Sequence, residues 1–472
     1  MKSLQPLRES CKEYDLLFNH HRISLPLGTP ISLTLFHSLL ILALGLLAGS
    51  AHAAQTMTLE QCLQKGQENN ATLQASLFKA EAAGKDVKAA RADFLPSLTS
   101  SYALNRIGSK SSEGPTEADY LNQEIHAANI KLTQTLYAGS RIVNAYDKAK
   151  LLELATQAEK ELTRLELAYN IESTFYKVLK AKQDTIVAAE AVARLRESVR
   201  AAESFFAKEL VPKVELLSAR VDLADAENQL GVARNNENRQ RVTLFALMNL
   251  SLDPQVDFVD DNPLTREAPP AFADCYQHAL DHRPDLQSLQ RQREAAAKQA
   301  DIALGKYLPV VQVNAGYYDE DRDYSELAST GYTTYDRDQA NTYWMVGLTV
   351  NWSLFDGGRS WYENEKYGLE GQRYAALIQE AYNTIATGIR KALYSMAEAE
   401  QRLAGSTDAL AAARENYAAE DNRLKAGVST ITALLDAQSR LVRAQVNQAN
   451  ATLDYQLAQS ELKFMTGGKK SW

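Results

Sequence analysis

A pair of histidines is the first group in this sequence whose spacing could support chemistry. His278 and His282 lie four residues apart, which places two imidazoles on one face of a helix and is compatible with metal binding. Arg283-Pro284 follows at once, and no cysteine or carboxylate pattern completes a ligand set. We therefore predict no metal site and no cofactor.

The cysteines are the second candidate group. Three cysteines are too few for a disulfide scaffold. Cys62 and Cys275 occupy equivalent positions in an internal repeat, and in an oxidising compartment they could pair. Equivalent positions need not be adjacent in space, however, so the sequence favours two buried free thiols.

No enzymatic activity is predicted, because no nucleotide-binding loop, catalytic triad or paired carboxylates stand out in the sequence. The formal net charge of −8 also argues against a nucleic-acid partner, since phosphate binding needs a positive face. The residue types therefore indicate no chemical activity, and the function has to be inferred from the arrangement of the predicted helices and strands.

Residues 1–53 are predicted to be a signal peptide. Leu33–Ala48 is an apolar run of the length of a secretory core, and Ala51 and Ala53 form a small-residue cleavage pattern. A transmembrane helix is the alternative, but the run is shorter than the ~20 apolar residues that span a bilayer. About thirty residues precede the run, which leaves the true start codon open. We expect an exported protein.

The mature sequence contains an internal duplication. Three matches have an offset of 213 residues, namely Cys62 with Cys275, Leu73 with Leu286, and Phe94-Leu95-Pro96 with Tyr307-Leu308-Pro309. Two have an offset of 218, namely Leu136–Arg141 with Leu354–Arg359 and Leu216–Ala219 with Leu434–Ala437. We predict a first repeat at 54–250, a linker at 251–271, a second repeat at 272–468 and a short tail at 469–472.

Each repeat is predicted to contain two strands, because apolar and polar residues alternate in four segments: Ser97–Ile107, Ile125–Tyr137, Val310–Tyr318 and Thr342–Phe355. A soluble antiparallel sheet on a core is one interpretation. A membrane barrel is the other, and two features favour it. Trp344 and Trp352 lie at the two ends of one apolar face, where interfacial aromatic residues belong, and the connectors Gly108–Glu124 and Asp319–Gln339 are polar.

The rest of each repeat is predicted to be helical. Glycine and proline together make up only about 7% of the chain, and no proline follows Pro309, which indicates long uninterrupted elements. A helix precedes each proline motif, at Glu60–Asp93 and Phe272–Lys306. Helical hairpins follow the strands, at Ile142–Glu209 with Glu215–Met248 and at Tyr374–Lys425 with Thr432–Met465. The fold class is therefore α+β.

Four strands cannot close a barrel, and an open edge in lipid would leave backbone groups without hydrogen bonds. Membrane-inserted strands would therefore require several copies of the chain. Side chains nearly fill an eight-stranded barrel, so a conducting pore favours three or more copies.

This layout resembles the TolC-type outer-membrane efflux and type I secretion channels. The resemblance rests on the duplicated proline motifs, on the Gly-[Ser/Gly]-Arg motifs at 139–141 and 357–359, and on the sequence of Lys425–Gln438. It implies a homotrimer in the outer membrane of a Gram-negative bacterium. Twelve strands would form the transmembrane barrel, embedded in outer-membrane lipid, and the helical hairpins would form a periplasmic α-barrel.

The resemblance also implies partners and site residues. A periplasmic adaptor and an ATP-driven or proton-driven inner-membrane pump would dock at the hairpin tips, Val211-Pro212 and Gly427-Val428-Ser429. Asp436 would contribute to an acidic ring at the channel constriction. The first tip carries Glu209 where the second has Gly427, and it appears one residue shorter in the sequence. The alternative to a channel is a periplasmic coiled-coil scaffold with a small soluble sheet.

Overall fold

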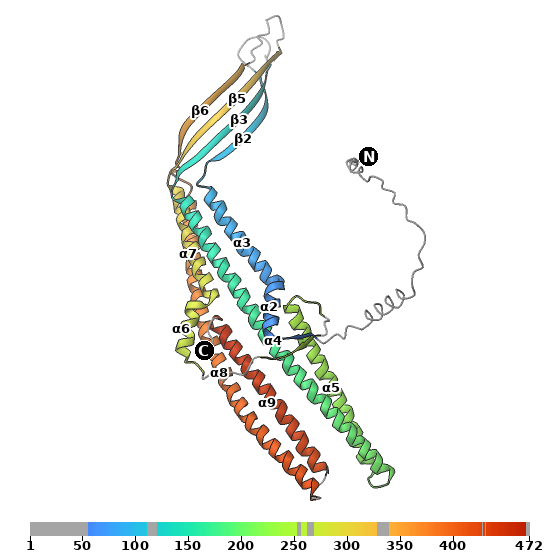
Figure 1. Ribbon diagram of the computed structural model, residues 1–472. Helices are drawn as coiled ribbons and strands as arrows, with labels where there is room; N and C mark the ends of the chain where they lie inside the picture. The colour runs from blue at the N-terminus through green and yellow to red at the C-terminus, as the bar shows by residue number, and fades with distance from the viewer. Residues whose placement is uncertain are drawn as a thin grey trace, which may run out of the picture. The chain divides into compact units, whose positions relative to one another are not determined.

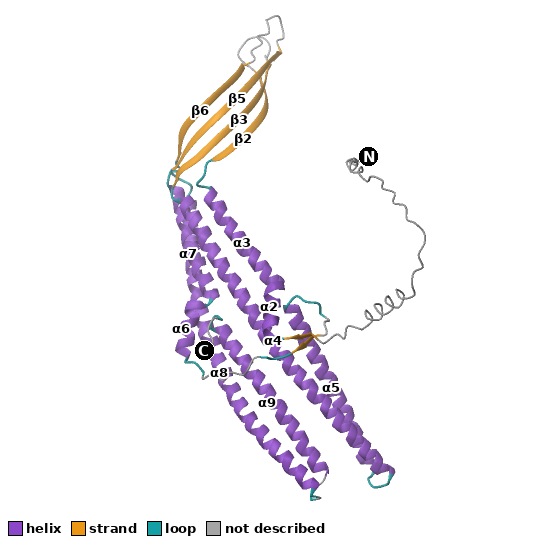
Figure 2. Ribbon diagram, in the orientation of Figure 1, coloured by secondary structure: helices purple, strands orange, loops and turns teal. Residues whose placement is uncertain are grey.

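The computed structural model describes residues 55–110, 120–252, 256–261, 269–327, 339–426, 428–429 and 431–468. The predicted signal peptide, the tail at 469–472 and Gly427 lie outside the described residues. Figures 1 and 2 show the strands at one end of a set of long helices. No helix among the described residues is both long enough and apolar enough to cross a membrane.

The same order of elements occurs in the two halves of the chain. The first half contains α2 (Leu59–Asn69), α3 (Ala71–Ala92), β2 (Ser97–Lys110), β3 (Tyr120–Ala138), α4 (Arg141–Ala207) and α5 (Lys213–Leu247). The second contains α6 (Phe272–His282), α7 (Pro284–Leu304), the 3-10 turn η1 (Gly305–Tyr307), β5 (Val310–Leu327), β6 (Gln339–Asn351), α8 (Arg359–Lys425) and α9 (Ile431–Met465). Helices α4 and α8 both have 67 residues, and α5 and α9 both have 35.

The helix before each proline motif is broken into two, where the sequence predicted one. Asn70 is extended and caps α3, because its side-chain oxygen accepts a hydrogen bond from Leu73 N at 3.0 Å. Its amide also donates to Leu247 O at 2.8 Å, which ties the break to the end of α5. Arg283 is extended because it precedes Pro284, and that proline begins α7.

Helix α8 begins at Arg359, well before the predicted Tyr374. Gly368 and Gly371 lie inside it, although each glycine costs about 1 kcal/mol in a helix interior. Packing of α8 along α7 and α9 outweighs that cost. The two tip connections have equal length, since five residues separate the end of α4 at Ala207 from Lys213, and five separate the end of α8 at Lys425 from Ile431. The prediction that the first tip is one residue shorter than the second was therefore wrong.

The four long strands form one antiparallel sheet in the order β2-β3-β5-β6. The strands have 14, 19, 18 and 13 residues, so β2, β3 and β5 extend into the segments predicted as polar connectors, and Asp319–Asp323 lie within β5. Backbone pairing with a neighbour continues there regardless of side-chain polarity. At the other end, β6 stops at Asn351, so Trp352 lies just beyond the strand rather than inside it.

A second, smaller sheet was missed by the sequence reasoning. Strand β1 (Gln55–Met57) pairs in parallel with β4 (Val256–Phe258), which lies inside the predicted linker at 251–271. Arg241 donates to Val256 O at 2.7 Å, and Lys182 forms an ion pair with Asp257 at 2.6 Å. These contacts hold the connection between the halves against α4 and α5. Three-residue strands carry too few residues for an alternation pattern to be visible.

The buried core consists of two clusters, and each contains one of the equivalent cysteines. Cys62 packs with Ile171 and Phe175, and Cys275 packs in the cluster that contains Ile389 and Tyr455. Both thiols are buried and no disulfide joins them, which confirms the preference for two buried thiols over a disulfide. Burial raises the pKa of the Cys62 thiol to about 12, because the apolar surroundings disfavour the thiolate.

The duplicated glycine motifs connect a strand to a helix through two successive left-handed residues. In the first motif Gly139 has φ +64° and Ser140 has φ +61°, and in the second Gly357 has φ +72° and Gly358 has φ +83°. Glycine reaches this conformation without steric cost, which explains its place in both motifs. A Cβ at Gly139 would also lie 2.3 Å from Gly305 O, so the first connector packs tightly against the end of α7.

We predict that the two thiols of the mature chain are unreactive in the folded protein. Near pH 8 a thiol reagent such as DTNB should modify neither Cys62 nor Cys275, since both are buried and the raised pKa of Cys62 keeps its thiol protonated. After denaturation without reductant, both should react, and the Cys62→Ser variant should lose one of the two reactive groups. No reactive thiol in the denatured chain would indicate a disulfide and contradict this result.

Candidate functional site

The long sheet has one apolar face that is exposed. Alternate side chains on all four strands make up this face: Leu98, Tyr102, Leu104, Ile130, Leu132, Tyr317, Trp344, Val346, Leu348 and Val350. The register aligns them in rows, with Leu98 opposite Leu132 and Ala315 opposite Val346. Trp344 is 76% exposed and Leu98 is 69% exposed. A contiguous apolar surface of this kind marks a face that contacts lipid or another protein.

The opposite face of the sheet carries a ladder of polar contacts. Thr133 donates to the side-chain oxygen of Asn314 at 3.1 Å, and the Asn314 amide donates to Thr349 at 3.0 Å. Gln312 donates to Thr135 at 3.2 Å. These bonds cross β3, β5 and β6 on one side, because successive side chains on a strand point to opposite faces. The sheet thus separates an apolar side from a hydrogen-bonded polar side.

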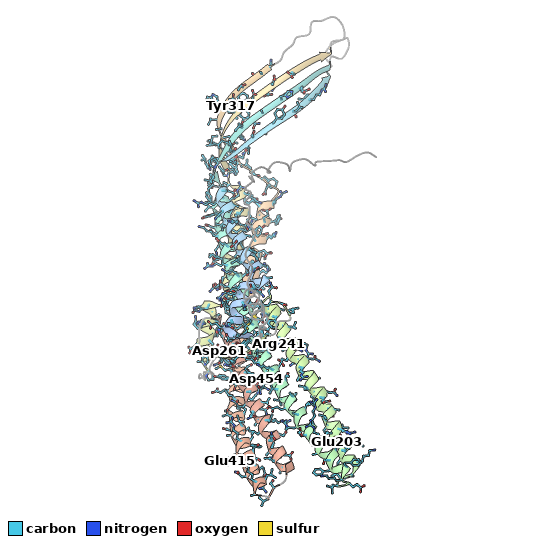
Figure 3. The ribbon with its side chains drawn as sticks, turned by 45° about the vertical axis from the view of Figure 1, so that its right-hand side comes forward. Glu203, Arg241, Asp261, Tyr317, Glu415 and Asp454 are labelled. Carbon is cyan, nitrogen blue, oxygen red and sulfur yellow. The ribbon has the colours of Figure 1, made fainter. Side chains whose placement is uncertain are left out.

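The two tryptophans predicted as a girdle lie at the ends of the apolar stretch of β6. Trp344 is directly opposite Tyr317 of β5, which is labelled in Figure 3. Asp319 follows on the same face two residues beyond Tyr317. Trp352, past the end of β6, donates its indole N–H to Tyr307 O at 2.8 Å. Eight residues of extended chain span about 26 Å between the tryptophans, close to the ~25 Å apolar band of outer-membrane barrels.

The first hairpin tip is a tight turn between α4 and α5. Glu209 has φ +59°, and Leu210 N donates to Phe205 O at 3.0 Å, which closes the end of α4. Val211 is half-buried, whereas Pro212 is exposed and precedes the first residue of α5. A non-glycine residue thus adopts the left-handed conformation at the position equivalent to Gly427.

The second tip exposes an apolar side chain beside a fixed turn. Val428 is 65% exposed, and its N–H donates to Arg423 O at 3.0 Å. Ser429 donates its hydroxyl to Glu420 at 2.7 Å, and this hydrogen bond lowers the pKa of the Glu420 carboxyl. Both tips therefore offer an apolar group on a turn held by backbone hydrogen bonds. Glu203 and Glu415 lie near the two tips in Figure 3.

Asp436 lies on the second turn of α9 and is exposed, whereas the next residue, Ala437, is buried. Within one chain this carboxylate lies on a helix surface, and a ring of carboxylates would require the same residue from other copies. Its role at a constriction therefore stays a prediction.

The two histidines have a structural role. Their rings stack with centroids 4.1 Å apart. His278 Nδ1 lies 3.0 Å from Thr466 O, and His282 Nδ1 lies 3.0 Å from His278 O, so each Nδ1 donates to a carbonyl. The first bond ties α6 to the residue that follows α9. Across the described ranges, no group of three or more histidine, cysteine or acidic side chains gathers to hold a metal ion.

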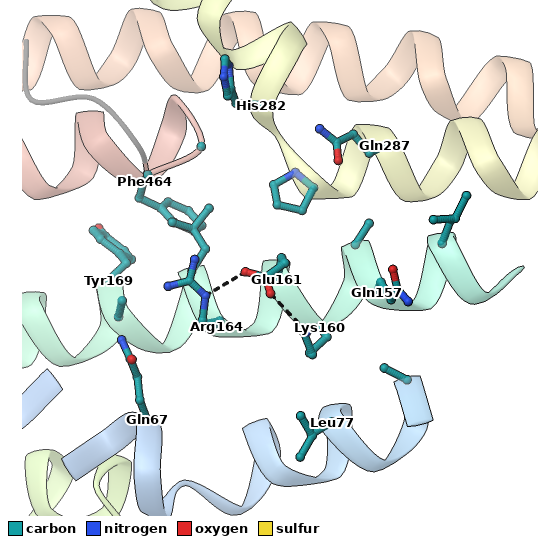
Figure 4. Close-up of a pocket in the computed structure, with 18 of the residues that line it drawn as sticks. Gln67, Leu77, Gln157, Lys160, Glu161, Arg164, Tyr169, His282, Gln287 and Phe464 are labelled. Atoms are coloured by element: carbon teal, nitrogen blue, oxygen red, sulfur yellow. Dashed lines mark hydrogen bonds and ion pairs between the residues drawn. The ribbon is translucent and has the colours of Figure 1, made fainter. Parts of the chain in front are cut away.

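Sequence reasoning also missed an open cleft of about 800 Å³ between α3, α4, α7 and the end of α9 (Figure 4). Tyr169 stacks on Phe464 at one side of it, with ring centroids 4.7 Å apart. Arg164 donates to Glu161 at 2.8 Å, and Lys160 pairs with the same carboxylate at 3.3 Å. No sequence signal identifies this cleft, because its walls come from segments as far apart in the chain as Leu63 and Gly468.

Comparisons with known proteins identify the family to which this arrangement belongs. The profile of the family described as outer membrane efflux protein matches residues 62–250 and 275–468. The outer membrane efflux protein BepC of Brucella suis biovar 1 is 23% identical over 432 residues, which cover 91% of this chain and 90% of that protein. The outer membrane protein TolC of Escherichia coli K12 is 23% identical over 443 residues, with coverage of 91% and 86%.

Solved structures show the same fold. The outer membrane channel CmeC of Campylobacter jejuni superposes with a TM-score of 0.72 at 18% identity, covering 87% of this chain and 85% of that chain. The outer-membrane channel OprN superposes with a TM-score of 0.69 at 18% identity, covering 87% and 90%. Both the sequence match and the fold span the two halves of the molecule. The chain therefore belongs to the outer membrane efflux protein family.

Proposed function

We propose that this protein is an outer-membrane channel that serves as the passive exit duct of a tripartite efflux pump or type I secretion system. The observation that carries the proposal is the long sheet, which has an exposed apolar face on one side and a polar ladder on the other. In a barrel the first face would contact outer-membrane lipid, and the second would line a water-filled lumen. The family membership and the channel fold of CmeC and OprN support this assignment.

The proposed channel is a homotrimer. In one chain β2 and β6 are edge strands, and an edge in lipid leaves backbone groups without partners at a cost of several kcal/mol each. Three copies would bring twelve strands together, enough for a lumen that side chains do not fill. The polar ladders of all copies would then face the same lumen.

The long helical hairpins would form a periplasmic α-barrel that continues the channel. Each 67-residue helix is about 100 Å long at 1.5 Å per residue, which puts the tips far from the membrane. We propose that a periplasmic adaptor and an inner-membrane pump, driven by ATP or by protons, dock at these tips. Drugs or secreted polypeptides are the cargo classes that such a duct would carry.

The alternative is a periplasmic scaffold without channel activity, and the exposed apolar face argues against it. A soluble scaffold would cover Trp344, Leu348 and Val350 or replace them with polar residues. Cell fractionation separates the two functions. A channel should remain with the outer membrane after carbonate extraction, whereas a scaffold should be washed off.

The apolar face predicts a difference between neighbouring positions on β6. Val350→Arg should destabilise the assembled trimer, because it places a cation on the lipid-facing side of β6. The cost should lie below the ~2–4 kcal/mol of the membrane midplane, since Val350 is only two residues from the interfacial Trp352. Asn351→Arg is the matched control and should be tolerated, since that residue faces the proposed lumen. The measurement is the yield and heat stability of the trimer in outer membranes. Equal effects of the two substitutions would show that the faces are assigned wrongly.

The proposed docking of the adaptor at the tips predicts that a bulky substitution there impairs efflux. Gly427→Trp should abolish efflux while trimer insertion stays normal, because a bulky side chain would block the adaptor and strain the turn. Glu209→Gly is the control and should be tolerated, since Glu209 has φ +59° and glycine adopts that conformation freely. Efflux is measured as drug resistance in a strain that depends on this channel. Full resistance with Gly427→Trp would place docking elsewhere.

The proposed ring of Asp436 predicts cation selectivity. Three carboxylates in a narrow entrance favour cations, and salt screens them only partly. In planar bilayers the purified channel should conduct cations preferentially, and Asp436→Ala should weaken both this selectivity and block by divalent cations. Reversal potentials in a salt gradient provide the measurement. Unchanged selectivity and block in the variant would show that Asp436 is a solvated helix carboxylate.

A further inference from the structure

The last described residues of the chain lie in the open cleft between α3, α4, α7 and the end of α9. Gly467 and Gly468 both line this cleft, with φ +93° and +83°. Gly468 N donates to Lys463 O at 2.8 Å, which fixes the turn after α9. A Cβ at Gly468 would lie 2.4 Å from Leu165 Cδ1. The residues that follow Gly468 therefore start at the surface of the cleft, directly against α4.

The cleft exposes large apolar side chains on α3 and α4. Leu77 is 43% exposed and Leu154 is 45% exposed, and both line the cleft. Figure 4 shows Leu77 on α3 and Phe464 near the end of α9, with Glu161 of α4 between them. Exposed leucines in a concave surface mark a place where an apolar group binds.

Two carboxylates that line the cleft have no cationic partner among the described residues, Glu81 of α3 and Glu153 of α4. Glu153 accepts one long hydrogen bond, from Gln157 at 3.4 Å. A Cβ at Gly84 would lie 3.2 Å from Glu153 Oε1, so this carboxylate lies beside α3. The cleft thus has two negative charges that no described lysine or arginine pairs with.

The other carboxylates of the cleft are already paired. Glu161 accepts from Arg164 at 2.8 Å and lies 3.3 Å from Lys160 Nζ. The buried Glu172 pairs with Lys463 at 3.0 Å. An additional cation that enters the cleft would therefore be attracted to the α3 side, where the unpaired carboxylates lie, rather than to the α9 side.

The four residues that follow Gly468 have the matching chemistry. Their sequence is Lys469-Lys470-Ser471-Trp472, which gives two cations and one large aromatic side chain. Tryptophan buries more apolar area than most side chains, and lysine carries its charge on a long stem that can cross apolar surface. Two lysines match two unpaired carboxylates, and one indole matches the exposed leucines.

The segment is long enough to reach these groups. The ion pair of Lys79 with Glu159 at 2.7 Å fixes the level of α3 on α4. Because the two helices run in opposite directions, Leu77 lies only about 6 Å along α4 from Leu165, at 1.5 Å per residue. Four residues of extended chain span about 13 Å. Trp472 can therefore cross α4 and reach Leu77.

We propose that the segment Lys469–Trp472 docks in this cleft of its own chain. Trp472 packs on Leu77 and Leu154, and the two lysines pair with Glu81 and Glu153. The segment then ties the end of the second half to α3 and α4 of the first half. This inference goes beyond the proposed function, because the docking takes place within one chain whether or not that chain forms a channel.

Cross-linking in the full-length protein tests the place of Trp472. Trp472→Cys with Leu77→Cys should form a disulfide within one chain on mild oxidation, seen as a monomer of altered mobility in a non-reducing gel. Cys62 and Cys275 are buried and should not compete. Trp472→Cys with Phe78→Cys is the matched control, since Phe78 is the next residue on α3, is 64% exposed and does not line the cleft. Equal cross-linking of the two pairs would overturn the docking.

Tryptophan fluorescence tests the ion pairs. The emission of Trp472 is the difference between the wild-type protein and Trp472→Phe, and it should be blue-shifted and protected from acrylamide. Glu81→Lys with Glu153→Lys should shift it to the red and remove the protection, because the lysines are then repelled. Adding Lys469→Glu with Lys470→Glu should restore the wild-type signal. A solvent-like Trp472 signal in the wild-type protein would overturn the proposal, and an unchanged signal after charge reversal would overturn the lysine pairing.

Discussion

Backbone hydrogen bonding at the strand edges is the constraint on which this structure depends. Each strand must pair on both sides or end in a place where water can satisfy its N–H and C=O groups. The internal strands β3 and β5 pair with each other along nearly their whole length, including the stretch rich in acidic residues at Asp319–Asp323. In the long sheet, as far as the structure describes it, β2 and β6 each have one open edge. In an isolated chain in water, an exposed apolar face beside two open strand edges is unfavourable. In the proposed channel, lipid would cover the apolar face and further copies would pair with the open edges.

The long helices α4 and α8 follow the strands of the sheet through short, ordered connections. Each strand-to-helix connection uses two left-handed residues, so β3 turns directly into α4, and the end of β6 leads through Gly357 and Gly358 into α8. Asp356 stabilises the second connection by accepting hydrogen bonds from Gly358 N at 3.0 Å and Ser360 N at 2.9 Å. The Ser360 hydroxyl bonds to the same carboxylate, and these hydrogen bonds lower its pKa. A rigid connector of this kind keeps the direction of a 67-residue helix fixed relative to the strands.

The middle of the molecule joins the two halves through contacts between distant segments. Lys463 near the end of α9 pairs with the buried Glu172 of α4 at 3.0 Å, and Lys180 pairs with Asp454 at 2.8 Å. Arg283, also buried, forms a two-pronged pair with Asp285 and donates to Met465 O. A buried charge left without its partner is strongly unfavourable, so the pair of Lys463 with Glu172 helps to fix how the halves meet, whereas the contacts of Arg283 lie within the second half. The small sheet of β1 and β4 lies in the same region and packs against α4 and α5.

The sequence by itself determined the α+β class, the long hairpins and the four strands, because alternation and helical periodicity are local properties of the chain. It also determined the two-fold repetition, since equivalent residues such as Cys62 and Cys275 recur at an offset of 213 residues before the strand connection, and equivalent residues after it recur at 218. The break at Arg283 follows locally from Pro284, whereas the strand ends, the break at Asn70 and the pairing of β1 with β4 were decided only by the tertiary structure. These features depend on which backbone groups find partners hundreds of residues away, and no local pattern encodes that. The same reason left Trp352 outside β6: within one chain, no strand lies beside it.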